Sequence, residues 1–326
     1  MVRTVPSPVV TIRRQPHPGT HRTAGSAGGA VDRRSVLRGG LGLGAVALGG
    51  SWLAACGGDS ADGTRVADGQ VPENALIAAF PQGVPHVPTG VPTRLPYLLA
   101  DKEGVPLSRI DGPVTFTVEQ DGRAVGQPVQ VAPRSDGVPR AYLPLTFTFP
   151  QAGFYDVFAA YGGAKLDSTI QVYGADQIGP PVVGEQLPPA ATATMAKPLV
   201  DPVCSRVPPC PFHEVDLVDA IGKGKPIVLM VATPAYCQTA VCGPILDTLV
   251  DQASGRTDIT VIHSEVYRNP KDVRDIQDAN LAPVPDTYDL RFEPAMFVTN
   301  AAGTIVARAD ITVDRTEMTE LLALAK

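Results

Sequence analysis

The chain has 326 residues, a length that suggests about two domains. With 44% hydrophobic and 18% charged residues it can bury cores, which excludes wholesale disorder, while 33 prolines and 32 glycines predict long connectors. Only one long apolar tract is present, near the N-terminus, which excludes a polytopic membrane protein. Residues 1–55 hold seven basic and one acidic residue; the rest holds 20 basic and 32 acidic residues, a balance that argues against nucleic-acid binding.

Residues 1–55 have the composition of a disordered segment followed by a signal peptide. Arg33 and Arg34 precede a glycine- and alanine-rich run that is too short for a spanning helix. The arginine pair resembles the twin-arginine export signal, and Leu53-Ala54-Ala55-Cys56 resembles the lipobox of bacterial lipoproteins. The resemblance implies a lipid on Cys56, a tether over residues 56–74 and an extracytoplasmic protein anchored to the bacterial cell membrane. An N-terminal anchor helix with an incidental cysteine is the alternative.

Residues 75–173 show short alternating segments and no helical period. Apolar residues at 114, 116 and 118 alternate with polar ones before Asp121-Gly122, and further strands are expected near 145–149, 155–161 and 170–173. This spacing predicts an antiparallel β-sandwich of immunoglobulin-like type, without a disulfide, serving as a spacer or docking module. Residues 174–199, rich in proline and glycine, are predicted to be a linker.

Residues 200–326 change to an α/β pattern. Ile227 to Ala232 is a continuous apolar run, as in a strand buried on both faces. The elements that follow are predicted to be a helix over 241–250, a strand over 259–262, a helix over 270–283, a hairpin over 295–307 and a last helix opened by Asp314 and Glu317 as a capping box. Strand, helix, strand, helix, strand, strand, helix is the order of the thioredoxin fold.

The cysteines of this region add a resemblance to the thioredoxin family. Cys237 follows the buried strand by a short loop and leads to Pro244-Ile245-Leu246-Asp247, which is similar to the active-site helix of thioredoxins. Downstream, Tyr288 to Pro294 resembles the segment ending in the cis-proline that faces the redox cysteines. The resemblance implies a thiol–disulfide oxidoreductase without a cofactor or metal, with Cys237, Cys242 and Pro294 as catalytic residues. Its partners would be thiols or disulfides of envelope proteins, or a membrane electron donor.

The sequence also departs from that family. Ala240 holds the second position of Cys-x-x-Cys, so the partner of Cys237 is Cys242 and the motif is Cys-x4-Cys. That spacing resembles some atypical two-cysteine peroxiredoxins, but Pro234 stands where those have a threonine, which weakens a thiol peroxidase assignment. The buried acid of thioredoxins would fall near Val231, so no such acid is expected.

Helix geometry constrains the Cys-x4-Cys pair. Residues five apart in a regular α-helix have Cα atoms roughly 8.7 Å apart, whereas disulfides rarely exceed about 7 Å. At least one cysteine must therefore lie outside regular helix, and Gly243-Pro244 favours a late helix start. Cys237, nearer the loop and the helix N-terminus, is predicted to be the nucleophile and Cys242 the resolving thiol. A permanent disulfide without turnover is the alternative.

Cys204 and Cys210 lie in a proline-dense loop and are predicted to form a structural disulfide. A second redox pair is one alternative. Another is a soft metal such as Cu(I) held by these thiols and His213, or by Cys237, Cys242 and His263. His86, in a proline-rich connector, is expected to be solvated.

The sequence thus predicts a membrane-anchored thiol–disulfide oxidoreductase, and leaves open the direction of electron flow. The alternatives are a non-catalytic thioredoxin-fold binding lipoprotein, a thiol peroxidase or a copper-handling protein.

Overall fold

The computed structural model describes residues 73–237, 241–272 and 280–326. The predicted signal peptide with Arg33 and Arg34, the lipidation site Cys56 and nearly all of the tether 56–74 lie outside the described residues. Across those described ranges, no helix has both the length and the apolar character needed to cross a membrane.

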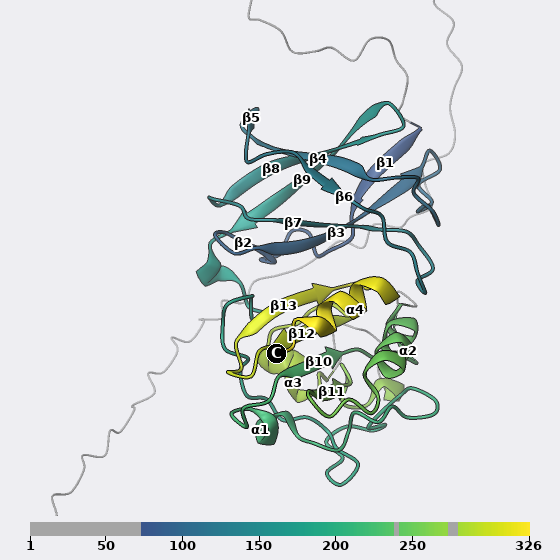
Figure 1. Ribbon diagram of the computed structural model, residues 1–326, viewed down its shortest axis with the longest axis vertical. Helices are drawn as coiled ribbons and strands as arrows, with labels where there is room; N and C mark the ends of the chain where they lie inside the picture. The colour runs from purple at the N-terminus through teal and green to yellow at the C-terminus, as the bar shows by residue number, and fades with distance from the viewer. Residues whose placement is uncertain (1–72, 238–240, 273–279) are drawn as a thin grey trace, which may run out of the picture. The chain divides into compact units, whose positions relative to one another are not determined.

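Residues 74–173 form a β-sandwich with a single apolar core between two sheets (Figure 1). The smaller sheet has the order β1 (Asn74–Ala78), β3 (Thr93–Asp101), β7 (Leu143–Phe147). The larger sheet has the order β2 (Val87–Pro88), β9 (Ala164–Tyr173), β8 (Gly153–Tyr161), β4 (Val114–Gln120), β5 (Arg123–Ala124), with β6 (Val129–Val131) also paired to β4. The prediction of a sandwich is confirmed.

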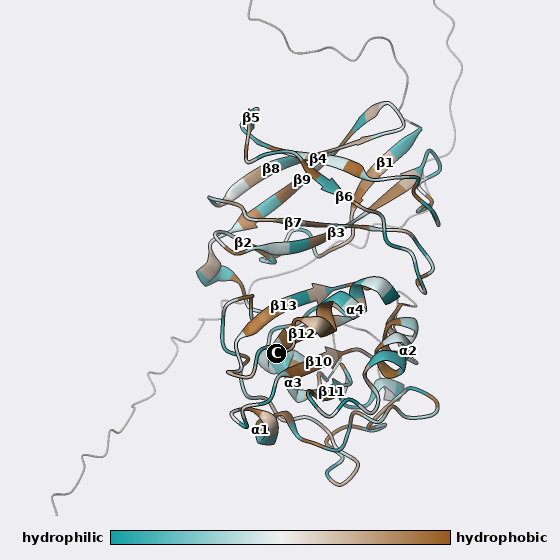
Figure 2. Ribbon diagram, viewed as in Figure 1, coloured by the Kyte–Doolittle hydropathy of each residue, from teal (hydrophilic) through white to brown (hydrophobic). Residues whose placement is uncertain are grey.

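The side chains of β4 show why the alternating pattern gives a sandwich strand. Val114, Phe116 and Val118 are buried in the core, while the polar residues between them point to the other face. Figure 2 shows the resulting alternation of brown and teal along the sandwich strands. Asp121 and Gly122 both have positive φ and form the tight hairpin turn between β4 and β5.

The C-terminal region contains a four-stranded mixed sheet with helices on both faces. The strand order is β11 (Thr260–Ser264), β10 (Ile227–Val231), β12 (Ala295–Thr299), β13 (Ile305–Asp310). β10 is parallel to β11 and antiparallel to β12, which is antiparallel to β13. The helices are α1 (Leu217–Ala220), α2 (Cys242–Ala253), α3 (Pro283–Thr287) and α4 (Arg315–Ala323), and short 3-10 turns lie at Ala175–Gln177 and Pro270–Asp272. Most of the helix predicted over 270–283 falls on residues outside the description.

Strand β10 explains how the sheet is covered. All five of its residues are buried; Val228 and Met230 pack with α2 and α4, while Leu229 and Val231 pack with α1 and α3. A strand buried on both faces needs no polar alternation, and Figure 2 accordingly shows β10 in brown. The predicted hairpin is present as β12 and β13.

The predicted linker is in close contact with the C-terminal sheet. The N–H of Gly184 donates to the Ile305 carbonyl (2.9 Å), and the Ile305 N–H donates to the Glu185 carbonyl (2.8 Å). Leu187 and Ala190 are buried in the core beneath β10 and β12. This part of residues 174–199 therefore has a fixed position along β13 despite its proline content.

The start of α4 shows how the sandwich contacts the C-terminal region. Arg94 forms a buried ion pair with Glu317 (Nε to Oε1, 2.6 Å). The Tyr142 hydroxyl donates to Glu317 (2.5 Å) and accepts from the Asp314 N–H (2.7 Å). Asp314 caps the helix by accepting from the Glu317 N–H (2.8 Å). In a complete capping box the Glu317 side chain would accept the N–H of Asp314. Here the Tyr142 hydroxyl accepts that N–H, because the Glu317 carboxylate binds Arg94.

The solvated position expected for His86 is wrong. The ring is only 3% exposed, stacks on Phe80 and meets the edge of Phe292. Its Nε2 lies 3.6 Å from Asp310, yet burial lowers the pKa of His86 to about 4, against the raising effect of that carboxylate. The proline-rich connector that carries His86 packs against Phe292 and Asp310 of the C-terminal region. The local sequence pattern does not predict this contact.

Candidate functional site

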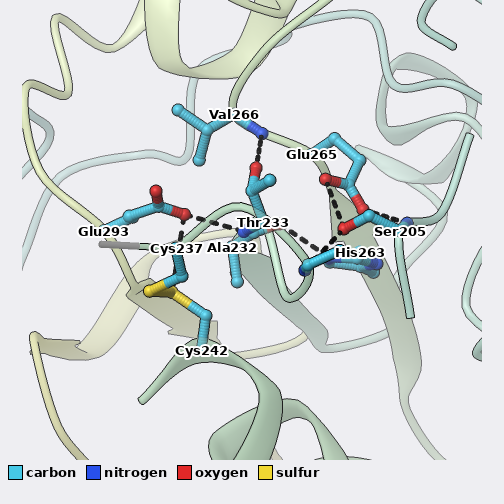
Figure 3. Close-up of a disulfide and its surroundings, with 10 residues drawn as sticks. Ser205, Ala232, Thr233, Cys237, Cys242, His263, Glu265, Val266 and Glu293 are labelled. Carbon is cyan, nitrogen blue, oxygen red and sulfur yellow. Dashed lines mark hydrogen bonds between the residues drawn. A yellow bond between two sulfur atoms is a disulfide. The ribbon is translucent and has the colours of Figure 1, made fainter. Parts of the chain in front are cut away.

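Cys237 and Cys242 form a disulfide with a Cα–Cα distance of 6.1 Å (Figure 3). α2 begins at Cys242, and Cys237 lies in the loop that follows β10. The predicted late helix start is therefore confirmed: the bond is possible because Cys237 lies before α2 and only Cys242 belongs to the helix.

The two sulfurs differ in exposure. Cys242, the first residue of α2, is fully buried, whereas Cys237 is half-buried and follows the exposed Tyr236. The first helical position belongs to Cys242, so the helix N-terminus is the wrong reason for choosing Cys237 as the nucleophile. Accessibility remains as the reason, because a partner sulfur can approach Cys237 and cannot approach Cys242.

Glu293 is a carboxyl group beside the disulfide that the sequence reasoning missed. Its Oε2 lies 3.4 Å from the Cys242 sulfur and accepts a hydrogen bond from the Thr233 N–H (2.7 Å). Burial raises the pKa of Glu293 to about 7, against the lowering effect of the Thr233 N–H. A carboxyl that gains or loses its proton near neutral pH can exchange it with a thiol at Cys242.

The place of Glu293 in the chain explains why it was overlooked. The expected position of an acid, near Val231, is an apolar residue within β10. The carboxyl comes instead from the residue before Pro294, and the Glu293–Pro294 peptide bond is cis. The sequence did contain a signal for Glu293. Because Pro294 is predicted to face the cysteines, the residue before it is also expected to lie near them.

The Thr233 hydroxyl joins the loop before Cys237 to the segment after β11. It is fully buried, and its Oγ1 accepts the N–H of Val266 (2.8 Å). The hydroxyl therefore helps to hold the loop after β10 against the segment after β11.

Cys204 and Cys210 do not form the predicted disulfide. Both are free, buried thiols whose sulfurs are 3.8 Å apart, nearly twice the length of a disulfide bond. The N–H of Cys210 donates to the Cys204 sulfur (3.4 Å). The physical reason is a shared third group: both sulfurs approach Nδ1 of His263, at 3.7 Å and 3.4 Å.

His213 and His263 complete a buried group of four side chains with the two thiols. His213 Nε2 lies 3.0 Å from His263 Nδ1, and both rings are almost inaccessible to solvent. His263 comes from β11 and joins Cys204 and Cys210, whereas sequence reasoning grouped it with Cys237 and Cys242. We call Cys204, Cys210, His213 and His263 the Cys2His2 cluster.

Hydrogen bonds within the cluster shift the pKa values of the two thiols in opposite directions. The Cys210 thiol lowers the pKa of Cys204, an effect that His213 and His263 reinforce against burial. The same Cys204 interaction, with burial, raises the pKa of Cys210. The hydrogen bond to Cys204 raises the pKa of His263 despite burial. The protonated group thus resembles a buried thiolate–imidazolium pair.

Backbone and side-chain contacts join the Cys2His2 cluster to the disulfide loop (Figure 3). His263 Nε2 donates to the Ala232 carbonyl (2.9 Å), at the end of β10. The N–H of Ala235 donates to the Ser205 hydroxyl (3.2 Å), and that hydroxyl donates to Glu265 (3.1 Å). The residues next to Cys204 therefore help to position the loop that carries Cys237.

Comparisons with known proteins return little for this chain. No family model and no curated protein matches it. Among solved structures, an engineered protein is similar at 21% identity and a TM-score of 0.22 over 31% of this chain, which spans 20% of that protein. A chain of the titin M10–obscurin-like 1 Ig complex is similar at 20% identity and a TM-score of 0.19, over 31% of this chain and 92% of that one. The PKD domain of the human VPS10 domain-containing receptor SorCS2 is similar at 14% identity and a TM-score of 0.16, over 39% of this chain and 98% of that domain.

Proposed function

We propose that the C-terminal region is a thioredoxin-like domain that exchanges disulfides with other proteins through Cys237 and Cys242. The observation that carries the proposal is the disulfide at the start of α2, with one half-buried sulfur and a titratable carboxyl against the buried one. The mixed sheet supports it, because α2 follows the central strand β10 and Pro294 directly precedes β12.

The exchange can be written with its electrons and protons balanced. In the reducing direction, the Cys237 thiolate attacks a partner disulfide, forms a mixed disulfide and releases one partner thiolate. The Cys242 thiol then gives its proton to Glu293 and attacks the Cys237 sulfur, which forms the Cys237–Cys242 bond and releases the second partner thiolate. Two electrons pass from the cysteine pair to the partner, and the oxidising direction is the reverse.

The N-terminal motifs and the sandwich suggest where the redox domain acts and how it is held there. The motifs at Arg33-Arg34 and Cys56 favour an exported lipoprotein, so the partners would be envelope proteins or a membrane electron donor. An immunoglobulin-like sandwich, joined to α4 through Arg94 and Tyr142, would then hold the redox domain away from the lipid anchor.

Mixed-disulfide trapping tests the proposal. In membranes from cells making Cys242→Ser, Cys237 should remain bonded to partner proteins, because the resolving thiol is gone. Cys237→Ser should trap almost nothing, because its remaining sulfur is buried. Serine replacement of both Cys204 and Cys210 in the Cys242→Ser background is the matched control and should still trap. Equal trapping by the two single variants would contradict the assignment of roles.

A non-catalytic binding module is the second candidate, favoured by the extent to which the disulfide is enclosed: Cys242 is fully buried. If mild reductants leave the Cys237–Cys242 bond intact in the folded protein and no variant traps a partner, the bond is a permanent cross-link. The binding-module assignment then replaces the oxidoreductase.

A further inference from the structure

We propose that Cys204, Cys210, His213 and His263 bind a zinc ion in a closed tetrahedral site, separate from the exchanging disulfide. The four side chains each offer one ligand atom, and all four atoms lie within 4.8 Å of one another. Three of the residues come from the loop before α1 and the fourth from β11, so the ion would join this loop to the sheet. Two thiolates and two imidazoles are one of the standard ligand sets of structural zinc.

Four of the six separations between the ligand atoms are close to the edges of a tetrahedron around zinc, and the other two are no longer than 4.8 Å. With Zn–S bonds of about 2.3 Å and Zn–N bonds of about 2.05 Å, the edges should be about 3.8 Å for S···S, 3.55 Å for S···N and 3.35 Å for N···N. The structure has 3.8 Å between the sulfurs, 3.7 and 3.4 Å from the sulfurs to His263 Nδ1, and 3.0 Å between the two nitrogens. Small shifts would suffice to receive the ion.

The outer nitrogens of both rings provide a second, independent observation. Nε2 of His263 lies 2.9 Å from the Ala232 carbonyl, and Nδ1 of His213 lies 3.3 Å from the Ala193 carbonyl. A carbonyl only accepts, so both outer nitrogens carry protons. The inner nitrogens, Nδ1 of His263 and Nε2 of His213, face each other and the thiols, and each can offer a lone pair to a metal once the protons held among these groups are released. Metal-binding histidines are oriented in this way by partners of their other nitrogen.

Charge favours zinc over a monovalent soft metal. Two thiolates and Zn²⁺ are neutral together, whereas two thiolates and Cu(I) leave one negative charge in a site whose ligands are all buried. Glu265, also buried and bonded to Ser205, would face that excess charge. An uncompensated buried charge is costly, so the divalent ion fits better. Binding releases two protons from the four ligands and transfers no electron.

Metal analysis of the full-length chain tests the site. The protein, purified under reducing conditions without chelator, should retain one zinc per chain by elemental mass spectrometry, while His213→Gln and Cys210→Ser should retain none. The control with serine at both 237 and 242 should retain one. Co²⁺ offered in place of zinc should give the visible absorption bands of a tetrahedral, thiolate-bound ion in the wild type and the control.

A measurement on the wild type covers the case in which the ligand variants fail to fold. Removing zinc with a chelator should lower the melting temperature and open Cys204 and Cys210 to alkylation, and added Zn²⁺ should reverse both effects. Reduced, folded protein that takes up no zinc, or whose Cys204 and Cys210 are recovered as a disulfide when zinc is supplied throughout, would overturn the proposal. Copper in place of zinc in the protein purified from cells supplied with both metals would overturn the choice of ion.

Discussion

The two cysteine pairs of the C-terminal region have similar spacing in the sequence and opposite surroundings in the fold. Cys237 and Cys242, five positions apart, are bonded to each other at a helix start, with one sulfur half-buried. Cys204 and Cys210, six positions apart, are unbonded and buried around His263. The difference teaches that the third group beside a pair, a carboxyl in one case and an imidazole in the other, determines its chemistry more than spacing does.

The largest expected difference between the pairs is in thiol reactivity. After mild reduction of the folded protein, Cys237 should be alkylated fastest, because its sulfur is partly accessible, while Cys204 and Cys210 should react only after zinc removal or unfolding. Peptide mass spectrometry with two isotopic forms of one alkylating reagent, added before and after denaturation, measures this. Comparable labelling of all four cysteines in the folded state would show that the two pairs do not differ in thiol reactivity.

Glu293 provides the next largest effect, on the disulfide pair alone. Glu293→Gln keeps an oxygen for the Thr233 N–H but cannot accept the Cys242 proton, so exchange at pH 8 should fall about 10²-fold. In the wild type the rate should rise with pH through about 7, where Glu293 loses its proton, and the variant should lack this inflection. Reduction of a model disulfide at a series of pH values checks both, with zinc content as the unchanged control.

The same variant should be more stable than the wild type at high pH. The folded-state pKa of Glu293 is about 7 against 4.5 for the ordinary group, so the folded protein holds the extra proton between these values. Its stability therefore falls as pH rises from 4.5 through 7, by no more than about 3 kcal/mol. Urea unfolding of the oxidised proteins at pH 5 and pH 8 should show Glu293→Gln gaining stability relative to wild type only at pH 8. No gain at pH 8 would show that Glu293 ionises without penalty and is a poor proton acceptor.

Much of the fold could be predicted because it depends on local pattern. The alternation in β4 and the continuous apolar run of β10 each report their burial directly. The late start of α2 followed from helix geometry and the limit on disulfide length. These predictions needed only residues a few positions apart.

The candidate sites depend on contacts that sequence spacing does not encode. His263 is 53 residues beyond Cys210 and meets it only because β11 lies beside the loop before α1. Glu293 reaches Cys242 from the segment before β12. His86 is buried by Phe292, far away in the chain. In each case a partner from a distant element determined the role of the residue, so local composition predicted the wrong environment or none.

A further prediction measures stability where the sandwich contacts the start of α4. Tyr142→Phe removes a buried hydroxyl that donates to Glu317 and accepts from Asp314, and should cost about 1–3 kcal/mol of unfolding free energy. Tyr155→Phe is the matched control: it also loses two bonds, a donated one to the Gln151 carbonyl and an accepted one from the Gln151 N–H, but it should cost less because Gln151 is exposed and water can replace the lost partner. Denaturant unfolding checks the order, and both variants should retain zinc and exchange at the wild-type rate per folded molecule.

The smallest effect tests whether the two pairs are coupled. Ser205 follows the zinc ligand Cys204, and its hydroxyl accepts the N–H of Ala235 in the loop before Cys237. Ser205→Ala removes this contact and the hydroxyl's bond to Glu265, which still accepts from the Ser205 N–H. Because Ala235 is exposed, water can replace its lost acceptor, and exchange should slow only roughly threefold, within the range of one hydrogen bond. Zinc should stay, since no ligand is lost. Ser264→Ala is the control, because that hydroxyl donates to the Glu265 carbonyl and does not contact the loop. A slower Ser205→Ala with an unchanged Ser264→Ala would show that the zinc loop positions Cys237, and unchanged rates in both would separate the two pairs functionally.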